Sequence, residues 1–462
     1  MSSVALDPVD WADEQFGLCD FGDVRRMRRV VKVAAQIAAN TDASTPSQTE
    51  NWSDCKRVYE LFDNDHITFQ KLLEPHWRAT RARKEGHFLL ICDTTEFDFG
   101  IHRKTKGLGP TGDGNGRGFF LHSAMMVDPT NSDLIGMAAQ EIFHRKPCRK
   151  GEKLMERKKR ARESEVWGRI VDQVGPPAPG VRFTHVCDRG ADNYEVFCHL
   201  VLQRSDWVIR AAQLQRSIIM PNGERMPLDQ YVMGWQPVGS YDLYVQAQNG
   251  QPARWAKLEV SFGDILMPAP QQRTPWLKEI GIVTIAMWGI QVREVDAPAH
   301  VKEPLRWVLF TSHATYSYND AYRVIEYYEQ RPMVEDYHKA IKTGCSLEDR
   351  QYQTTARLER LTGMMSLQAV RLVQLRTMVR TQPETPATKV VSKRWIEILA
   401  RLRKKTDPLE WTIRNFYREM AGLGGFLGRK GDGEPGWQTT WRGFNKLIQA
   451  LRGYEPRRHP TQ

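Results

Sequence analysis

Two short apolar runs, each followed directly by an aspartate, constrain the fold of this chain more than any other feature. The run FLLIC at residues 88–92 precedes Asp93, and the run FTHVC at residues 183–187 precedes Asp188. Apolar runs of this length are typical of buried strands. Open α/β sheets carry their functional groups beyond the carboxyl ends of the strands. Both aspartates are therefore predicted to end buried strands, at the edge where such sheets do their chemistry.

A second polar pattern is formed by Tyr328, Arg331, Glu335 and Lys342, at offsets of three, seven and fourteen from the first. At about 100° per residue, these offsets place four side chains on one narrow helical stripe. Because a core-facing stripe would be apolar, this one predicts a site, where the carboxylate suits a metal and the cations suit phosphate. Pro332 lacks an N–H, so we expect the helix to begin or kink there, with Tyr328 and Arg331 on the preceding turn.

Composition indicates a multidomain globular protein with a polyanionic partner. The 462 residues suffice for two to four domains, and the formal charge of +11 fits nucleic acid without proving it. The seven cysteines show no framework or C-x-x-C spacing, so buried, reduced thiols are expected. The sequence shows neither a secretion signal at its start nor an apolar run long enough to span a bilayer. We therefore expect a cytoplasmic protein that reaches DNA.

Residues 1–75 are predicted to form a helical first domain. Asp23 is a candidate N-cap for a helix that carries four arginines: Arg25, Arg26, Arg28 and Arg29. This cluster fits either phosphate contacts on DNA or a solvated charged face.

Residues 76–372 are predicted to form an α/β domain, interrupted at about 205–300 by a β-rich insertion in a mixed sheet. Residues 119–127 and 134–142 are expected to be paired strands. The glycine-rich segment 104–118 matches no P-loop and is expected to be a flexible loop. The basic run at 157–162 is expected to lie on a helix that is solvated or faces DNA.

The last domain, residues 373–462, is predicted to be helical and to carry the dimer contact. Its dense apolar set fits either a contact between two copies or a subdomain that packs on itself. The set comprises Trp411, Phe416, Leu423, Phe426, Trp437, Trp441 and Phe444.

The chain resembles the DDE transposases of bacterial cut-and-paste elements, in the insertion-sequence-four group and closest to the transposon-five type. The resemblance is carried by the pattern Y-x2-R-x3-E-x6-K, by Asp188 in the segment CDRGAD, and by Asp93 in the segment DTT. It implies an RNase H-like (retroviral integrase-like) core with a β-rich insertion, flanked by helical N- and C-terminal domains. The chain departs from the pattern at Gly190, where the family often has an acid, and at Pro332, where it has a bulky aromatic.

The resemblance also implies the site residues. Asp93, Asp188 and Glu335 would be catalytic and would hold two Mg2+ ions, for which Mn2+ would substitute, since carboxylates suit hard cations. Tyr328, Arg331 and Lys342 would hold DNA phosphates near the cleavage site. Arg210 would contact a phosphate, and Trp307 would stack on a nucleotide flipped out of the duplex. The arginines at positions 25–29 would bind DNA.

The implied activity is cut-and-paste transposition: cleavage at element ends, hairpin formation and resolution, and strand transfer into target DNA. The implied partners are double-stranded DNA (terminal inverted repeats and target) and a second copy of the chain in a paired-end complex. In a bacterium the protein would associate with the nucleoid when bound to DNA. Two alternatives stay open: a structure-specific nuclease on the same fold, and a catalytically silent DNA-binding inhibitor of transposition.

Overall fold

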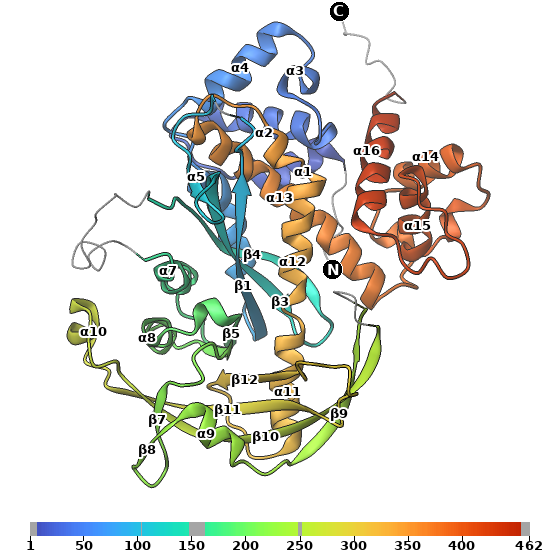
Figure 1. The fold of residues 1–462 in the computed structure, drawn as a ribbon. Coiled ribbons are helices and arrows are strands. Elements are labelled where there is room, and N and C mark those ends of the chain that lie inside the picture. The colour runs from blue at the N-terminus through green and yellow to red at the C-terminus, as the bar shows by residue number, and fades with distance from the viewer. Residues whose placement is uncertain (1–6, 103, 147–161, 248–251, 454–462) are drawn as a thin grey trace, which may run out of the picture.

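The computed structural model describes residues 7–102, 104–146, 162–247 and 252–453, and it shows a mixed α/β protein with helical ends (Figure 1). The predicted helix at residues 157–162 lies outside these residues except for its last member. The six described cysteines are free and buried, as predicted. In the parts of the chain with assigned structure, no helix is both long and apolar enough to cross a membrane.

The N-terminal domain is helical, as predicted. Its helices are α1 (Pro8–Phe16), α2 (Val24–Ala39), α3 (Thr45–Gln48), α4 (Trp52–Phe62) and α5 (Phe69–Arg81). The side chains of Asp7, Asp23, Asn51 and Thr68 accept hydrogen bonds from backbone N–H groups at the starts of α1, α2, α4 and α5. These bonds satisfy donors that a helix start leaves without an intrahelical partner. The predicted N-cap at Asp23 is confirmed.

One mixed sheet of twelve strands runs through the described protein. The strands are β1 (Gly86–Asp98), β2 (Gly109–Thr111), β3 (Gly116–Asp128), β4 (Asp133–Phe143), β5 (Val181–Cys187), β6 (Asp206–Arg210), β7 (Ser217–Ile219), β8 (Arg225–Pro227), β9 (Gly239–Val245), β10 (Arg254–Pro268), β11 (Thr284–Val295) and β12 (Arg306–Thr311). Their order is β2-β3-β1-β5-β6-β12-β11-β10-β7-β8, with β4 beside β3 and β9 beside β10. The pairs β1–β5 and β5–β6 are parallel, and β3 and β12 flank this group in the antiparallel sense.

The central strand β1 is buried on both faces, which explains its unbroken apolar run. Leu89 and Ile91 belong to one apolar core, while Leu90 and Cys92 belong to the other. Residues of α5 and α13 (Thr355–Thr381) contribute to the first core. Residues of α7 (Glu165–Val174) and α8 (Tyr194–Leu202) contribute to the second, so helices cover both faces of the sheet (Figure 1).

The insertion extends this same sheet. In β10 and β11 the antiparallel register runs from Lys257 opposite Val295 to Pro268 opposite Thr284, and β12 joins the pair to β6. Two six-residue helices interrupt the insertion, α9 (Leu228–Met233) and α10 (Pro275–Ile280). Helices this short show no period in a sequence, which is why the region reads as strands alone.

The glycine-rich segment 104–118 is not a flexible loop, contrary to the prediction. Its strand β2 pairs with β3 in the antiparallel sense. Lys106 donates a backbone hydrogen bond to Gln353 and accepts one from Thr355, both at 2.9 Å. Backbone pairing with a distant part of the chain therefore orders a segment whose glycines alone indicate mobility.

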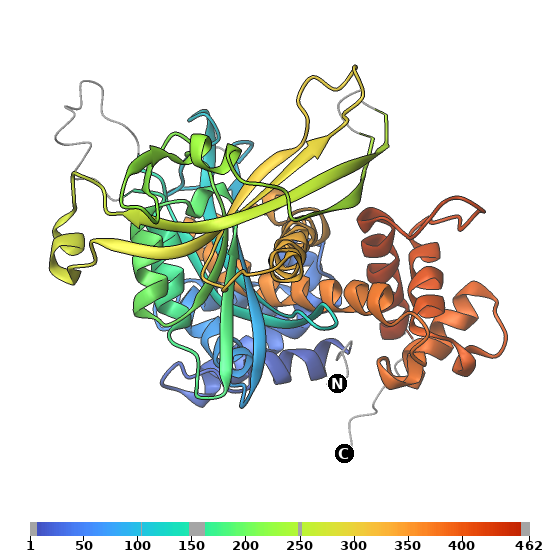
Figure 2. The same cartoon turned by 90° about the horizontal axis from the view of Figure 1, so that it is seen from below.

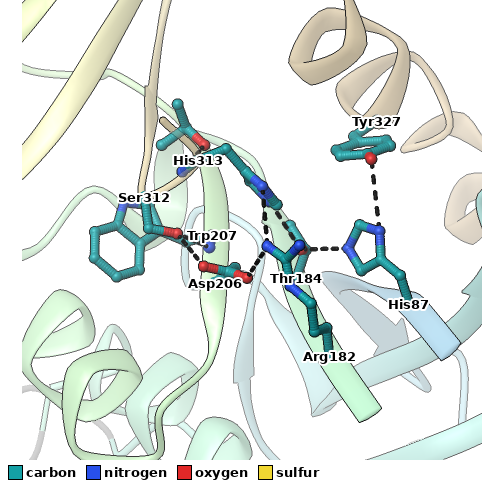
Figure 3. Close-up of polar contacts among 9 residues, drawn as sticks. His87, Arg182, Thr184, Asp206, Trp207, Ser312, His313 and Tyr327 are labelled. Carbon is teal, nitrogen blue, oxygen red and sulfur yellow. Dashed lines mark hydrogen bonds and ion pairs between the residues drawn. The ribbon is translucent and has the colours of Figure 1, made fainter. Parts of the chain in front are cut away.

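A polar network holds α11 (Tyr318–Glu329) against the starts of the parallel strands. The Thr184 hydroxyl lies 2.8 Å from His87 Nε2 and 2.9 Å from His313 Nε2. The Tyr327 hydroxyl of α11 lies 3.5 Å from His87 Nδ1 (Figure 3). Burial, followed by the neighbouring His313 and Arg182, lowers the pKa of His87 to about 4, so its ring is neutral near pH 7. The network thus ties Tyr327, in the last turn of α11, to His87 at the start of β1, six residues before Asp93.

The C-terminal helices form a group beside the core that α13 joins to it (Figure 2). The remaining helices are α12 (Pro332–Lys339), α14 (Lys393–Arg403), α15 (Ile413–Leu423) and α16 (Trp437–Gly453). The 27-residue α13 is continuous through residues 372 and 373, the predicted domain boundary, and most of its side chains are buried.

The apolar residues of the C-terminal domain are not all available for a dimer contact. Phe416 and Phe444 are 0% exposed and Trp441 is 5% exposed. For these three the second alternative, packing within the chain, holds. Phe444, for example, contacts the rings of Trp395 and Trp441, with centroids 5.9 Å and 6.0 Å apart. Trp411, Leu423, Phe426 and Trp437 are partly buried, and Leu427, between α15 and α16, is 71% exposed.

The crossing of α15 and α16 generates a prediction about stability. A Cβ atom at Gly443 would lie 1.9 Å from the carbonyl oxygen of Met420. We expect Gly443→Ala to lower the free energy of unfolding by at least about 1–3 kcal/mol, as measured by urea titration, because the helices must separate. The matched control is Gly436→Ala, where a Cβ would meet no described atom within 4 Å. Equal stability of the two variants would contradict the close crossing.

Candidate active site

Asp93 and Asp188 lie side by side on the two parallel strands β1 and β5. Cys92 is paired with Cys187 in the register, so the two aspartates follow at the same level. As predicted, β5 ends before Asp188, which begins the short helical turn η1 (Arg189–Ala191). The Asp188 carboxylate accepts a hydrogen bond from the Gly190 N–H at 2.7 Å, which fixes the turn.

Asp93 does not end its strand, contrary to the prediction. Residues 94–98 remain paired with β3, from Thr94 opposite His122 to Asp98 opposite Gly118. Only the parallel pairing with β5 stops at this level. Asp93 therefore lies at the level where the pairing of β1 with β5 stops.

The stripe from Tyr328 to Lys342 is divided between two helices. Helix α11 ends at Glu329 and α12 begins at Pro332, so the expectation that the proline starts a helix is confirmed. Tyr328 lies in the last turn of α11, and Arg331 lies between the helices. Glu335 lies in the first turn of α12, and Lys342 lies in the π-helical turn η2 (Ala340–Gly344).

The guanidinium group of Arg331 brings the three acids together. Its Nη1 lies 2.7 Å from Glu335 Oε1, while its Nη2 lies 3.8 Å from Asp93 Oδ2 and 3.8 Å from Asp188 Oδ2. Residues from β1, from the turn after β5 and from α12 therefore surround one cation. In the described part of the chain, no three Asp, Glu, His or Cys side chains are close enough together to hold a metal ion.

Burial makes it costly to hold charge on the acids of this cluster. The Asp93 side chain is 15% exposed, and burial raises its pKa from 3.8 to about 6. Arg331 acts to lower that pKa, whereas Asp188 and Glu335 act to raise it. Burial also acts to lower the pKa of Arg331, but Asp93 and the other nearby anionic groups outweigh burial and raise it. The guanidinium is therefore charged, and it partly offsets the repulsion among the carboxylates.

Lys342 and the buried His338 lie further along η2 and α12, and the contacts described for Lys342 are with Glu348 and Phe97, not with the three acids. Lys342 Nζ lies 4.0 Å from Glu348 Oε1 and 5.8 Å from the centroid of the Phe97 ring. Burial, followed by the cations Lys342 and Arg331, lowers the pKa of His338 to about 3, so this ring is neutral. The position of His338, three residues after Glu335, is a signal in the sequence that it lies near Glu335 on one helix face.

Tyr328 and Arg210 add a phenol and a second guanidinium group. Burial raises the pKa of Tyr328, while Arg210 and Arg331 act to lower it. Arg210 ends β6 opposite Leu309 of β12, and Trp307 lies two residues earlier on β12. Trp307 is partly buried against the core, and its indole N–H has no hydrogen-bond partner among the described residues.

A basic pocket adjoins the Asp188 turn. It has a volume of about 680 Å³, and its lining includes four arginines and two acids: Arg162, Arg189, Arg216, Arg225, Asp192 and Glu195. Arg216 forms a 2.6 Å ion pair with the buried Asp192.

The N-terminal arginines are placed differently from one another on α2. Arg25 and Arg28 are exposed, and Arg25 forms a 3.1 Å ion pair with Asp23. Arg26 donates a hydrogen bond to the Phe21 carbonyl at 2.8 Å, so part of its hydrogen-bonding capacity is used within the domain. Arg29 is partly buried. None of these arginines shares a described ion pair with the acid cluster.

The raised pKa of Asp93 predicts a pH-dependent gain in stability from Asp93→Asn. A carboxyl group with a raised folded pKa stabilises the fold below its unfolded pKa, and this stabilisation is lost as pH rises through about 6. Removing the charge should increase the free energy of unfolding at pH 8 by up to about 3 kcal/mol, and by less toward pH 4. Urea titrations at several pH values measure this difference. A difference that does not change with pH would contradict the prediction.

Two family models match the ends of this chain. Residues 8–67 match a model described as transposase DNA-binding, and residues 367–459 match a model described as transposase Tn5 dimerisation domain. These domains support DNA binding and homodimer formation, and they support the identification of a DNA transposase. The first covers α1 to α4 and the second includes α14 to α16. Together the two matches indicate a Tn5-type transposase, as the sequence motifs predict.

Proposed function

We propose that this protein is a metal-dependent DDE transposase that cleaves element ends, forms and resolves a DNA hairpin, and joins the element to target DNA. The observation that carries the proposal is the meeting of Asp93, Asp188 and Glu335 around Arg331. The three acids come from separate parts of the chain, and each is placed by a different element. A dimerisation domain favours a transposase over a simple nuclease, because transposition must act on two element ends at once.

The core is proposed to be RNase H-like. Strands β1, β5 and β6 are parallel, β3 and β4 continue the sheet in the antiparallel sense, and helices cover both faces. Asp93 and Asp188 occupy the level where the parallel pairing ends. This arrangement supports the fold that the sequence resemblance implies.

By residue type the donor set fits Mg2+, or Mn2+ in its place, but the three carboxylates would have to move closer together to hold an ion. Asp93, Asp188 and Glu335 offer only carboxylate oxygens, which hard cations prefer over nitrogen and sulfur. These residues would hold two ions, which would supply an activated attacking oxygen and stabilise the leaving one. In the DNA-free protein the Arg331 guanidinium provides the positive charge that these carboxylates require. We propose that Arg331 turns from the carboxylates to a DNA phosphate when the substrate binds.

The cations around the acids suit a phosphodiester backbone. The Tyr328 phenol lies beside Arg210, at the end of β6, and beside Arg331. Lys342 lies in η2, seven residues after Glu335. The basic pocket at the Asp188 turn extends this positive surface. We propose that Tyr328, Arg331, Lys342 and Arg210 hold phosphates. For Trp307 we propose stacking on a flipped nucleotide, which would require its ring to leave part of its packing.

Neutral replacements of the acids test the proposed chemistry. We expect Asp93→Asn, Asp188→Asn and Glu335→Gln each to reduce cleavage of element-end DNA below detection, since ligation of metal ions needs negative oxygens. DNA binding in a gel-shift assay should remain, because the predicted DNA-binding domain lies elsewhere. Glu326→Gln is a matched control, because this exposed carboxylate lies on the neighbouring helix α11. Cleavage near the wild-type rate would remove that acid from the proposed triad.

The exposed arginines of α2 test the DNA contact. Each phosphate contact that is lost should reduce the slope of log affinity against log salt by about 0.9. We therefore expect Arg25→Ala together with Arg28→Ala to make DNA binding weaker and less dependent on salt, as measured by fluorescence anisotropy. An unchanged slope would assign these two arginines to a solvated surface.

A further inference from the structure

The helix that carries Glu335 is fastened to the C-terminal domain by the next residue, Asp336. Its Oδ1 accepts a hydrogen bond from Trp437 Nε1 of α16 at 3.0 Å. The same carboxylate contacts two arginines of α13, with Oδ1 at 3.4 Å from Arg376 Nη1 and Oδ2 at 3.2 Å from Arg380 Nη1. The Asp336 side chain is only 18% exposed, so these contacts replace most of its water.

Two of the three partners of Asp336, Arg376 and Trp437, also contact one another. The Arg376 guanidinium lies 4.4 Å from the centroid of the Trp437 ring, a distance typical of a cation–π contact. Burial lowers the pKa of Arg376, and Asp336 acts to raise it. The anion, the cation and the indole therefore form one unit that joins α12, α13 and α16.

A second contact lies one helical turn further along α16. Trp441, four residues after Trp437, packs on Gly344 at the end of η2. A Cβ atom at Gly344 would lie 2.8 Å from Trp441 Cε3, so the indole occupies the space that any larger residue would need. This contact is apolar, and it is independent of the charges at Asp336.

These two contacts lie close to the ends of the functional stretch. Asp336 follows Glu335 directly, and Gly344 comes two residues after Lys342. The stretch includes a π-helical turn, an irregularity that is frequent at functional sites. Helix α16 therefore contacts the continuous segment of α12 and η2, which carries both Glu335 and Lys342.

We propose that helix α16 positions the catalytic helix, with Asp336 as a positioning residue that links the C-terminal dimerisation domain to the acid cluster. The inference rests on the proposed function for the role of Glu335. Asp336 does not touch the reacting groups in this arrangement. It fixes the rotation of the first turn of α12, and through it the direction of the Glu335 carboxylate. An ordered C-terminal domain is then a condition for an ordered active site.

Two substitutions separate the parts of this link. Trp437→Phe removes the indole N–H and keeps a ring over Arg376, whereas Asp336→Asn keeps an oxygen for Trp437 and removes the charge. We expect amide hydrogen exchange across residues 333–344 of the free protein to become faster in both variants. Cleavage within a preassembled paired-end complex should fall roughly tenfold, the size expected for losing one hydrogen bond to a charged group.

The matched control is Glu434→Gln, which breaks ion pairs with Arg414 and Arg418 inside the C-terminal domain. It should change neither the exchange at residues 333–344 nor cleavage. The link is supported if Trp437→Phe and Asp336→Asn keep the wild-type melting temperature and still pair DNA ends, while amide exchange at residues 333–344 becomes faster and DNA cleavage becomes slower. Wild-type amide exchange at residues 333–344 together with a wild-type cleavage rate would overturn the link. A fall in melting temperature with equal loss of binding, pairing and cleavage would also overturn it, since that pattern marks a purely structural contact.

Gly344→Ala tests the second contact without altering any charge. Its Cβ should displace Trp441 and raise exchange across the same residues, and normal exchange would contradict the role of this contact. Glu335→Gln separates this inference from the proposed function. If Glu335→Gln still cleaves DNA, the proposed function fails. If it is inactive while Trp437→Phe and Asp336→Asn behave as wild type, only the positioning role fails.

Discussion

The candidate site depends on a charge balance, in which two carboxylates from the sheet and one from α12 share a single guanidinium. Burying carboxylates is costly unless a cation is near, and here Arg331 lies within 4 Å of all three. The balance is incomplete, since burial still raises the pKa of Asp93 to about 6. Such a group of acids destabilises the fold, and it is kept where a function needs negative oxygens. The arrangement therefore concentrates negative charge around one guanidinium, at a cost to stability.

The surrounding architecture serves to hold this cluster in place. The starts of β1 and β5 are tied to α11 by the network around Thr184, which fixes the helix that leads to Arg331. At the other side, Asp336 ties α12 to α13 and α16. The segment that carries Glu335 is thus held on one side by the Tyr327–His87 contact to the sheet and on the other by the Asp336–Trp437 contact to the C-terminal domain. This continuity gives a physical route by which pairing of two copies would affect the chemistry of each.

Several expectations from the sequence hold because they depend on local chemistry. Asp23 caps α2 since a short acceptor side chain suits an N-cap, and Pro332 begins α12 since a residue without an N–H fits the first helical turn. Other expectations fail because partners come from distant residues. Asp93 stays within its strand since β3 continues to pair after β5 leaves, and Lys106 is ordered by Gln353 and Thr355.

The sequence by itself determined the mixed α/β class, the two apolar strands that precede the aspartates, and the residue types of the site. Those features follow from the spacing of apolar and polar residues, which can be read from neighbouring positions in the sequence. Only the tertiary structure decided that Arg331 lies among the acids, that His338 is buried near Arg331 and Lys342, and that Phe416, Trp441 and Phe444 are buried. Each of these depends on contacts between residues far apart in the chain, and one-dimensional spacing carries no information about which distant surfaces will meet.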